Sequence, residues 1–187
     1  MLKTVGFRTL RRRIRENNCV FDTADLALRR AGALLRVRQS GRLATLTYKG
    51  PAVPGKYKSR EELEIEISDA ATGRAILERL GFRLVFRYEK YRTEYTQPRA
   101  PLKGGGIVTL DETPIGCYLE LEGGPRWIDR TARALVFTES DYITASYARL
   151  YQEFCEARHI RPGDMLFAGK VRRERPRGRA SSGVSPR

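Results

Sequence analysis

The chain of 187 residues has few of the side chains that bind transition metals. Its single histidine, His159, excludes a His-rich metal site and an acid/base mechanism built on two histidines. Its three cysteines are scattered, fit no zinc-binding spacing and are expected to be reduced thiols in the cytoplasm. A metal ion used by this protein should therefore be a hard cation held by oxygen atoms.

Long hydrophobic runs are also absent. No stretch approaches the roughly 18 consecutive apolar residues of a membrane-spanning helix. The basic residues near the N-terminus are not followed by an apolar segment, so no secretory signal is visible. The sequence therefore predicts a cytoplasmic protein without a membrane partner.

Positive charge is abundant but lies mainly at the two ends of the chain. The net charge is +14, of which +6 lies in residues 1–15 and +6 in residues 170–187, leaving +2 for residues 16–169. The last segment is also rich in Pro, Gly and Ser, which predicts a basic disordered tail over 170–187. Nucleic acid is not expected as a partner, except for weak, non-specific contact by this tail.

Alternation of apolar and polar residues predicts strands through most of residues 1–169, which are expected to form one domain. Strands are expected at 59–68, 82–96, 107–113 and 117–123, and two more in 36–50 around Ser40-Gly41. Residues 7–21 are expected to form a pair of short strands, and 26–32, 71–81 and 138–158 to form helices. The expected fold class is α+β, with mostly antiparallel strands.

The strands share an unusual pattern, because one face of each is charged and the other apolar. Five cations and a set of acids occupy the charged faces, with like charges grouped along single strands, as in Glu120 and Glu122. An ordinary sheet with one wet face would explain the alternation. If the sheet closes into a barrel, the charged faces instead line a wet lumen and the apolar faces point outward under helices. Such a lumen could hold a polyphosphate and a divalent metal ion.

Several segments, in this order, resemble the CYTH superfamily of triphosphate tunnel metalloenzymes, which includes class IV adenylyl cyclases and thiamine triphosphatases. The matching segments span about 130 residues: FDTADLALRRAGALLRVR (21–38), LTYKGP (46–51), REELEIE (60–66), LGF followed by RYEKYRTEY (80–95), VTLDETPIGCYLELEG (108–123) and SYARLY (146–151). The resemblance implies an antiparallel barrel of eight strands around a charged tunnel, with helices outside. It also implies a triphosphate substrate and Mg²⁺ or Mn²⁺ as cofactor.

The resemblance implies a role for individual residues. Phosphate binding is implied for Arg36, Arg38, Lys49, Lys90 and Arg92. Lys49 and Asp111 are also the expected catalytic residues. Metal binding is implied for Glu120 and Glu122, and for Glu62 and Glu64, of which either could face the site.

One departure from the family pattern bears on activity. The family begins with a strand that carries Glu-x-Glu-x-Lys, and this motif occurs nowhere in the chain. The chain is therefore expected to begin after that strand. The sequence thus supports phosphate binding more strongly than it supports catalysis.

Three hypotheses follow. The first is a metal-dependent enzyme that either cyclises ATP with release of pyrophosphate or hydrolyses the terminal phosphate of a triphosphate. The second is a module that binds polyphosphate or nucleotide without turnover. The third is a basic RNA-associated protein that uses its termini, and the question of a homodimer is open in each.

Overall fold

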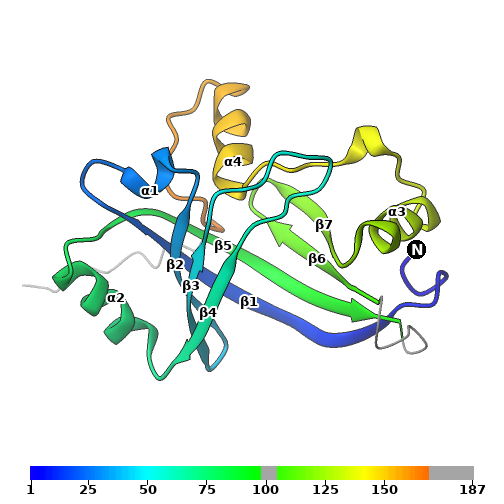
Figure 1. The fold of residues 1–187 in the computed structure, drawn as a ribbon, viewed down its shortest axis with the longest axis horizontal. Coiled ribbons are helices and arrows are strands. Elements are labelled where there is room, and N and C mark those ends of the chain that lie inside the picture. The colour runs from blue at the N-terminus through cyan, green and yellow to red at the C-terminus, as the bar shows by residue number, and fades with distance from the viewer. Residues whose placement is uncertain (98–104, 169–187) are drawn as a thin grey trace, which may run out of the picture.

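The computed structural model describes residues 1–97 and 105–168, whose strands form one antiparallel sheet (Figure 1). The predicted tail, 170–187, lies outside the described residues. Spatial order in the sheet is β4-β3-β2-β1-β5-β6-β7. The strands are β1 (Arg8–Asp22), β2 (Leu34–Ser40), β3 (Leu43–Lys49), β4 (Glu62–Ile67), β5 (Arg83–Thr96), β6 (Ile107–Thr113) and β7 (Gly116–Glu122). The predicted antiparallel α+β architecture is confirmed.

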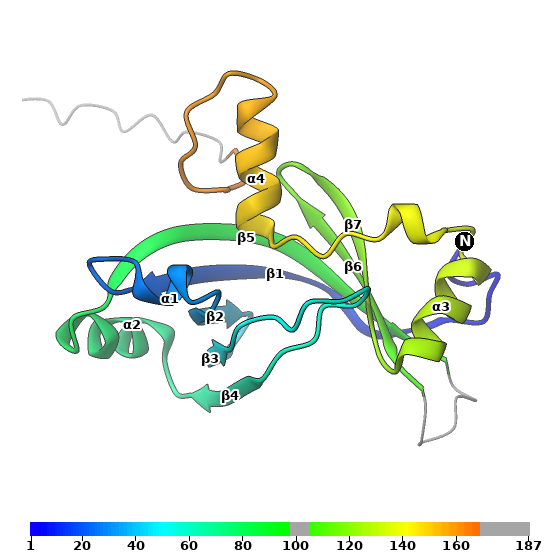
Figure 2. The same ribbon diagram turned by 45° about the horizontal axis from the view of Figure 1, so that its top comes forward.

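The sheet curls but does not close. β1 and β5 are long strands at the centre of the sheet, with β2–β4 on one side of them and β6–β7 on the other (Figure 2). Within the described residues β4 and β7 are edge strands that do not pair with each other, so the barrel of eight strands implied by the resemblance is not completed. The result is an open trough with one concave and one convex face.

β1 corrects the prediction of two short strands over 7–21. It is one continuous strand that pairs with β5 from Arg8↔Thr96 to Asp22↔Arg83. Register shifts between Thr9 and Arg11 and between Arg11 and Ile14 explain why alternation fails in the arginine-rich half. A bulge changes the face on which side chains lie without ending the strand, so side-chain pattern alone could not reveal its continuity.

The helices are α1 (Ala27–Arg30), α2 (Ala70–Arg79), α3 (Pro125–Ala134) and α4 (Tyr147–Glu156), with a 3₁₀ turn, η1, at Glu139–Asp141. The prediction of one helix over 138–158 is wrong in its first half. Thr138 and Asp141 do form a capping box, but it opens only η1, and α4 begins later at its own cap, Ser146. α3 was not predicted, although Gly124 followed by Pro125 is a recognised helix start.

The apolar faces of the strands point outward, as predicted, and two helices cover parts of them, while Leu63 and Ile65 of β4 remain exposed. Under α2, the buried residues Cys19, Phe21, Val37 and Leu77 form one cluster. Under α3, Phe7, Val108 and Trp127 form a second. Two separate convex cores therefore stabilise the two sides of the trough and leave its concave face to polar residues. No helix in the described part of the chain is long and apolar enough to cross a membrane.

Gly106 is required by close packing in the second core. A Cβ atom added there would lie 2.4 Å from the carbonyl oxygen of Glu122 and 2.6 Å from the Trp127 ring. Because both neighbours are held in place, we expect Gly106→Ala to lower the free energy of unfolding by about 1–3 kcal/mol. Denaturant unfolding measures this. Gly55→Ala is the control, because its added Cβ would have only an ordinary contact at 3.9 Å. An equal loss in both variants would contradict the packing argument.

Candidate functional site

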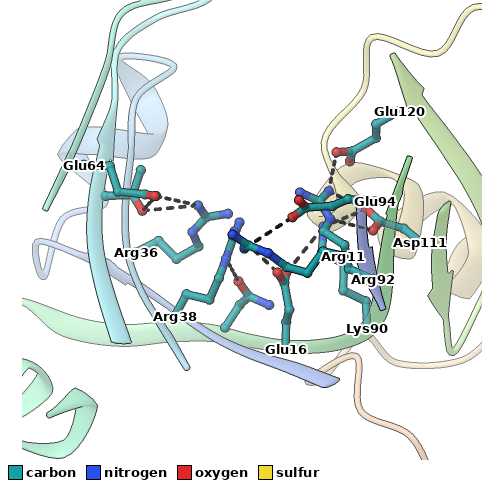
Figure 3. Close-up of polar contacts among 12 residues, drawn as sticks. Arg11, Glu16, Arg36, Arg38, Glu64, Lys90, Arg92, Glu94, Asp111 and Glu120 are labelled. Atoms are coloured by element: carbon teal, nitrogen blue, oxygen red, sulfur yellow. Dashed lines mark hydrogen bonds and ion pairs between the residues drawn. The ribbon is translucent and has the colours of Figure 1, made fainter. Parts of the chain in front are cut away.

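The concave face of the sheet gathers charged side chains from all seven strands, many of which are drawn in Figure 3. Antiparallel register places alternate residues of neighbouring strands on the same face, so Arg36 lies beside Thr47 and Arg92 beside Asp111. The five cations predicted from the sequence all lie on this face: Arg36, Arg38, Lys49, Lys90 and Arg92. Three of them, Arg36, Lys90 and Arg92, are buried.

Asp111 is the most completely bonded acid of this face. It is 0% exposed and accepts hydrogen bonds from Lys90 Nζ at 2.6 Å and from Arg92 Nε and Nη2 at 2.7 Å each. The hydroxyl of Tyr147, in α4, donates a further bond of 2.7 Å to it. α4 therefore packs against the concave side of the sheet, whereas the resemblance implied helices only outside.

The surroundings of Asp111 fix its charge. Burial alone would raise the pKa of this carboxyl group, but the Arg92 hydrogen bonds and the charges of Lys90 and Arg92 outweigh burial and hold the pKa well below its usual value. Asp111 is thus a permanent anion that orients two cations. A base that must accept a proton needs a free oxygen and a higher pKa, so this geometry favours positioning over proton transfer.

Arg36 is a buried cation whose hydrogen-bond donors are not all used by the described residues. Its Nη1 donates to the Tyr88 hydroxyl at 3.2 Å and its Nη2 to Thr47 Oγ1 at 3.2 Å. Glu64 Oε2 lies 3.6 Å from Nη2 and accepts a hydrogen bond from Thr47 at 2.6 Å. Nε of Arg36 is buried and has no hydrogen-bond partner in the described part of the protein. A buried guanidinium with an unused donor is suited to an anion.

Arg38 is held by two residues that the sequence did not single out. Its Nε donates to Asn18 Oδ1 at 3.1 Å, and its Nη1 lies 3.5 Å from Glu16 Oε1. Both partners belong to β1. The prediction of two short strands there does not define the face on which their side chains lie. Carrying the alternation back from Asn18 would have placed Glu16 on the concave face.

Lys49 lies at the rim of the trough, where it donates a 2.6 Å hydrogen bond to Glu62. Arg60 lies 3.5 Å from the same carboxylate. Burial lowers the pKa of Lys49, and the charges of Arg36 and Arg60 lower it further, against the opposing effect of Glu62. Three cations share this region, which favours the arrival of an anion.

The four predicted metal ligands lie on the two edge strands. Glu62 and Glu64 are in β4, and Glu120 and Glu122 are in β7. Glu120 bonds to Arg92, and Glu122 is exposed at the end of its strand. Within 1–97 and 105–168, no three His, Cys, Asp or Glu side chains gather closely enough to hold a metal ion. An ion of the Mg²⁺ type takes only one or two protein carboxylates and completes its shell with phosphate oxygens and water.

Tyr88 and Tyr147 are neighbours in the trough, with ring centroids 6.0 Å apart. Burial would raise the pKa of Tyr88, but the charges of Arg36, Lys90 and Arg38 lower it overall. Burial and the carboxylates of Glu120 and Asp111 raise the pKa of Tyr147. The Tyr88 hydroxyl therefore contacts a cation, Arg36, and the Tyr147 hydroxyl contacts a carboxylate, Asp111.

The β3–β4 loop connects the two sides of the open trough. Lys56 Nζ and the Tyr57 hydroxyl donate to Asp129 Oδ2 in α3, at 3.0 Å and 2.8 Å. The Tyr142 hydroxyl donates to the other oxygen of Asp129 at 2.9 Å. In Figure 1 this loop runs from the β3–β4 side toward β7 and α3. Side-chain bonds thus tie together the two sides of the sheet that no backbone pairing joins.

The comparisons with known proteins agree with this architecture. Residues 7–132 match the family model described as CYTH domain. A protein from Methanocaldococcus jannaschii, named as a candidate adenylate cyclase, is 31% identical over 122 residues, which is 65% of this chain and 66% of that protein. The match thus spans about two thirds of that relative.

Solved structures show the same fold. A protein from Pyrococcus horikoshii has a TM-score of 0.62 at 26% identity, covering 81% of this chain and 90% of its own. A candidate adenylate cyclase from Vibrio parahaemolyticus has a TM-score of 0.63 at 18% identity, covering 81% and 87%. An adenylyl cyclase candidate from Hippeastrum, described as having a dominant triphosphatase activity, has a TM-score of 0.58 at 18% identity, covering 76% and 83%.

Proposed function

Because the chain belongs to the CYTH family, we propose that it is a divalent-metal-dependent enzyme acting on a nucleoside or organic triphosphate. The observation that carries the proposal is the convergence of Arg36, Arg38 and Lys49 on one concave face, with a buried, unpartnered nitrogen on Arg36 among the described residues. Guanidinium groups bind phosphate through paired, charge-assisted hydrogen bonds. Names of relatives that include adenylate cyclase and triphosphatase support the same substrate class.

In this proposal Arg36, Arg38 and Lys49 bind the phosphates, while Asp111 holds Lys90 and Arg92 toward them. The positions of these cations are set before substrate arrives, so they can stabilise charge that develops on the phosphate oxygens without reorganising. Mg²⁺ or Mn²⁺, shared between the phosphates and one or two of Glu62, Glu64, Glu120 and Glu122, would neutralise further phosphate charge.

Two reactions use this grip on the phosphates. A cyclase joins the ribose 3′-hydroxyl to the α-phosphorus of ATP and releases pyrophosphate, whereas a hydrolase adds water at the terminal phosphorus and releases orthophosphate. We therefore expect purified protein with Mg²⁺ or Mn²⁺ to form one of these product sets from ATP or tripolyphosphate, and to form none in EDTA. Cyclic AMP, pyrophosphate and orthophosphate are measured in parallel, and their absence under all metal conditions would count against an enzyme.

A second candidate, a binding module without turnover, is favoured by one observation. Three of the four candidate metal ligands already contact cations: Glu62 with Lys49, Glu64 with Arg36, and Glu120 with Arg92. Acids used in this way are less free to hold a metal ion. Tight binding of tripolyphosphate in calorimetry, with no product formed under any metal condition, would support this candidate over the enzyme.

A further inference from the structure

Glu16 is a buried acid of the concave face whose contacts are loose. It is 3% exposed, yet its Oε1 lies 3.5 Å from Arg38 Nη1 and its Oε2 lies 3.7 Å from Lys90 Nζ. Charge-assisted hydrogen bonds are usually about 2.7–2.9 Å long. Oε2 of Glu16 has no hydrogen-bond partner in residues 1–97 and 105–168. A buried carboxylate is normally saturated, so the loose fit of this one requires an explanation.

The contrast with Asp111 shows that the loose fit is not a general property of the site. Both acids contact Lys90, but Asp111 does so at 2.6 Å and accepts three further hydrogen bonds from Arg92 and Tyr147. Movement of the Asp111 carboxylate away from Lys90 and Arg92 would therefore leave two buried cations without their counter-charge. Glu16 contributes charge to Arg38 and Lys90 without occupying their hydrogen-bonding directions.

Asn18 keeps Arg38 ready for a different partner. It accepts from Arg38 Nε at 3.1 Å, and its own Nδ2 donates to the Tyr88 carbonyl oxygen at 3.4 Å. Arg38 is thus oriented by a neutral side chain, and its terminal nitrogens point toward Glu16 in the trough (Figure 3). An arriving phosphate could form short bonds to them where Glu16 forms none.

We propose that Glu16 is an internal competitor for phosphate, a carboxylate that neutralises Arg38 and Lys90 in the empty trough and opposes the binding of a polyphosphate there. The inference rests on the proposed function, because it needs phosphate to bind these cations. Before binding, Glu16 limits repulsion between Arg38 and Lys90. After binding, its negative charge repels the phosphates across a poorly solvated site. Glu16 therefore weakens retention of polyphosphate and sets the affinity of the site for substrate and product.

Glu16→Gln tests this directly, because it removes the charge and keeps the shape. The probe is inorganic tripolyphosphate, titrated by calorimetry in EDTA at fixed salt so that no metal contributes. We expect Glu16→Gln to bind at least about tenfold more tightly than the wild type, since a like charge near the ligand is removed. Glu16→Asp keeps the charge but withdraws it by one methylene group, and we expect a smaller gain of about threefold.

Glu112→Gln is the matched control, because it makes the same change in net charge on the opposite face. Glu112 is in β6 next to Asp111, but its side chain pairs with Arg13 on the convex side. Its affinity for tripolyphosphate should equal that of the wild type. A gain of the same size in Glu112→Gln would assign the effect to net charge alone and overturn the proposal.

The thermal stability of the unliganded proteins, compared with their affinity for tripolyphosphate, distinguishes the proposal from a purely structural role. Glu16→Gln should melt at a lower temperature, because Arg38 and Lys90 lose a counter-charge, while its affinity rises. Equal or weaker binding by both Glu16 variants would overturn the proposal. That is the result expected if Glu16 instead holds a metal ion or only packs against its neighbours. If neither the wild type nor these variants binds tripolyphosphate, with or without Mg²⁺, the proposed function itself fails.

Discussion

Asp111→Asn is expected to lower the free energy of unfolding by about 3–5 kcal/mol, because it leaves two buried cations without their shared counter-charge. Lys90 is 2% exposed and Arg92 is 9% exposed, so water cannot replace the lost carboxylate. The asparagine amide has one acceptor oxygen in place of the two carboxylate oxygens, so at least one of the donors on Lys90, Arg92 and Tyr147 loses its hydrogen bond. Urea unfolding followed by circular dichroism measures the loss.

The pH dependence of the same variant provides an independent check. The pKa of Asp111 is held below its unfolded value, so its stabilisation is fully present above about pH 4 and is lost as the pH falls toward the folded pKa. The difference in stability between wild type and Asp111→Asn should therefore shrink below about pH 4. Glu112→Gln, on the exposed side of the same strand, should change stability little. A small effect of Asp111→Asn at neutral pH would show that water reaches this site.

Arg36→Met is expected to weaken binding of tripolyphosphate by about 100-fold, because a phosphate loses two charge-assisted hydrogen bonds. Methionine roughly preserves the length and apolar stem of arginine, so the fold should persist. The contacts that Arg36 makes in the free protein are long, at 3.2 Å to Tyr88 and Thr47, and add little to stability. Calorimetry with tripolyphosphate, and product formation from ATP, measure the two consequences.

Arg13→Met is the control for Arg36→Met, because it removes an arginine from the opposite face. Arg13 lies over the Tyr91 ring and pairs with Glu112 on the convex side. It should bind tripolyphosphate as the wild type does. Equal losses in both variants would indicate attraction by net charge alone, and an unaffected Arg36→Met would place the phosphate elsewhere.

Alternation in the sequence was sufficient to predict most of the strands and the faces on which their side chains lie. β2, β3 and β4–β7 were predicted because each has an apolar side that packs or faces outward and a charged side that lines the trough. The five cations were placed correctly on one face for the same reason. The resemblance to the CYTH family is confirmed by the match over residues 7–132.

Two predictions failed for different reasons, one because of pairing between distant segments and one because of local capping signals. β1 is continuous because β5 pairs with it along its whole length. Bulges in the arginine-rich half interrupt the alternation of side chains, so periodicity in the sequence does not reveal this continuity. The expected helix over 138–158 divides because two capping signals compete, one at Thr138 and one at Ser146. The roles implied for the metal-binding and phosphate-binding residues remain predictions.

The sequence by itself determined which side of each strand is charged, because side-chain alternation in a strand is a local property of the backbone. Only the tertiary structure decided how the charges are used. The fourfold bonding of Asp111, the loose contacts of Glu16 and the spare nitrogen of Arg36 depend on ångström distances between strands that are far apart in the chain. Hydrogen bonds and burial vary steeply over such distances, whereas residue spacing does not encode them.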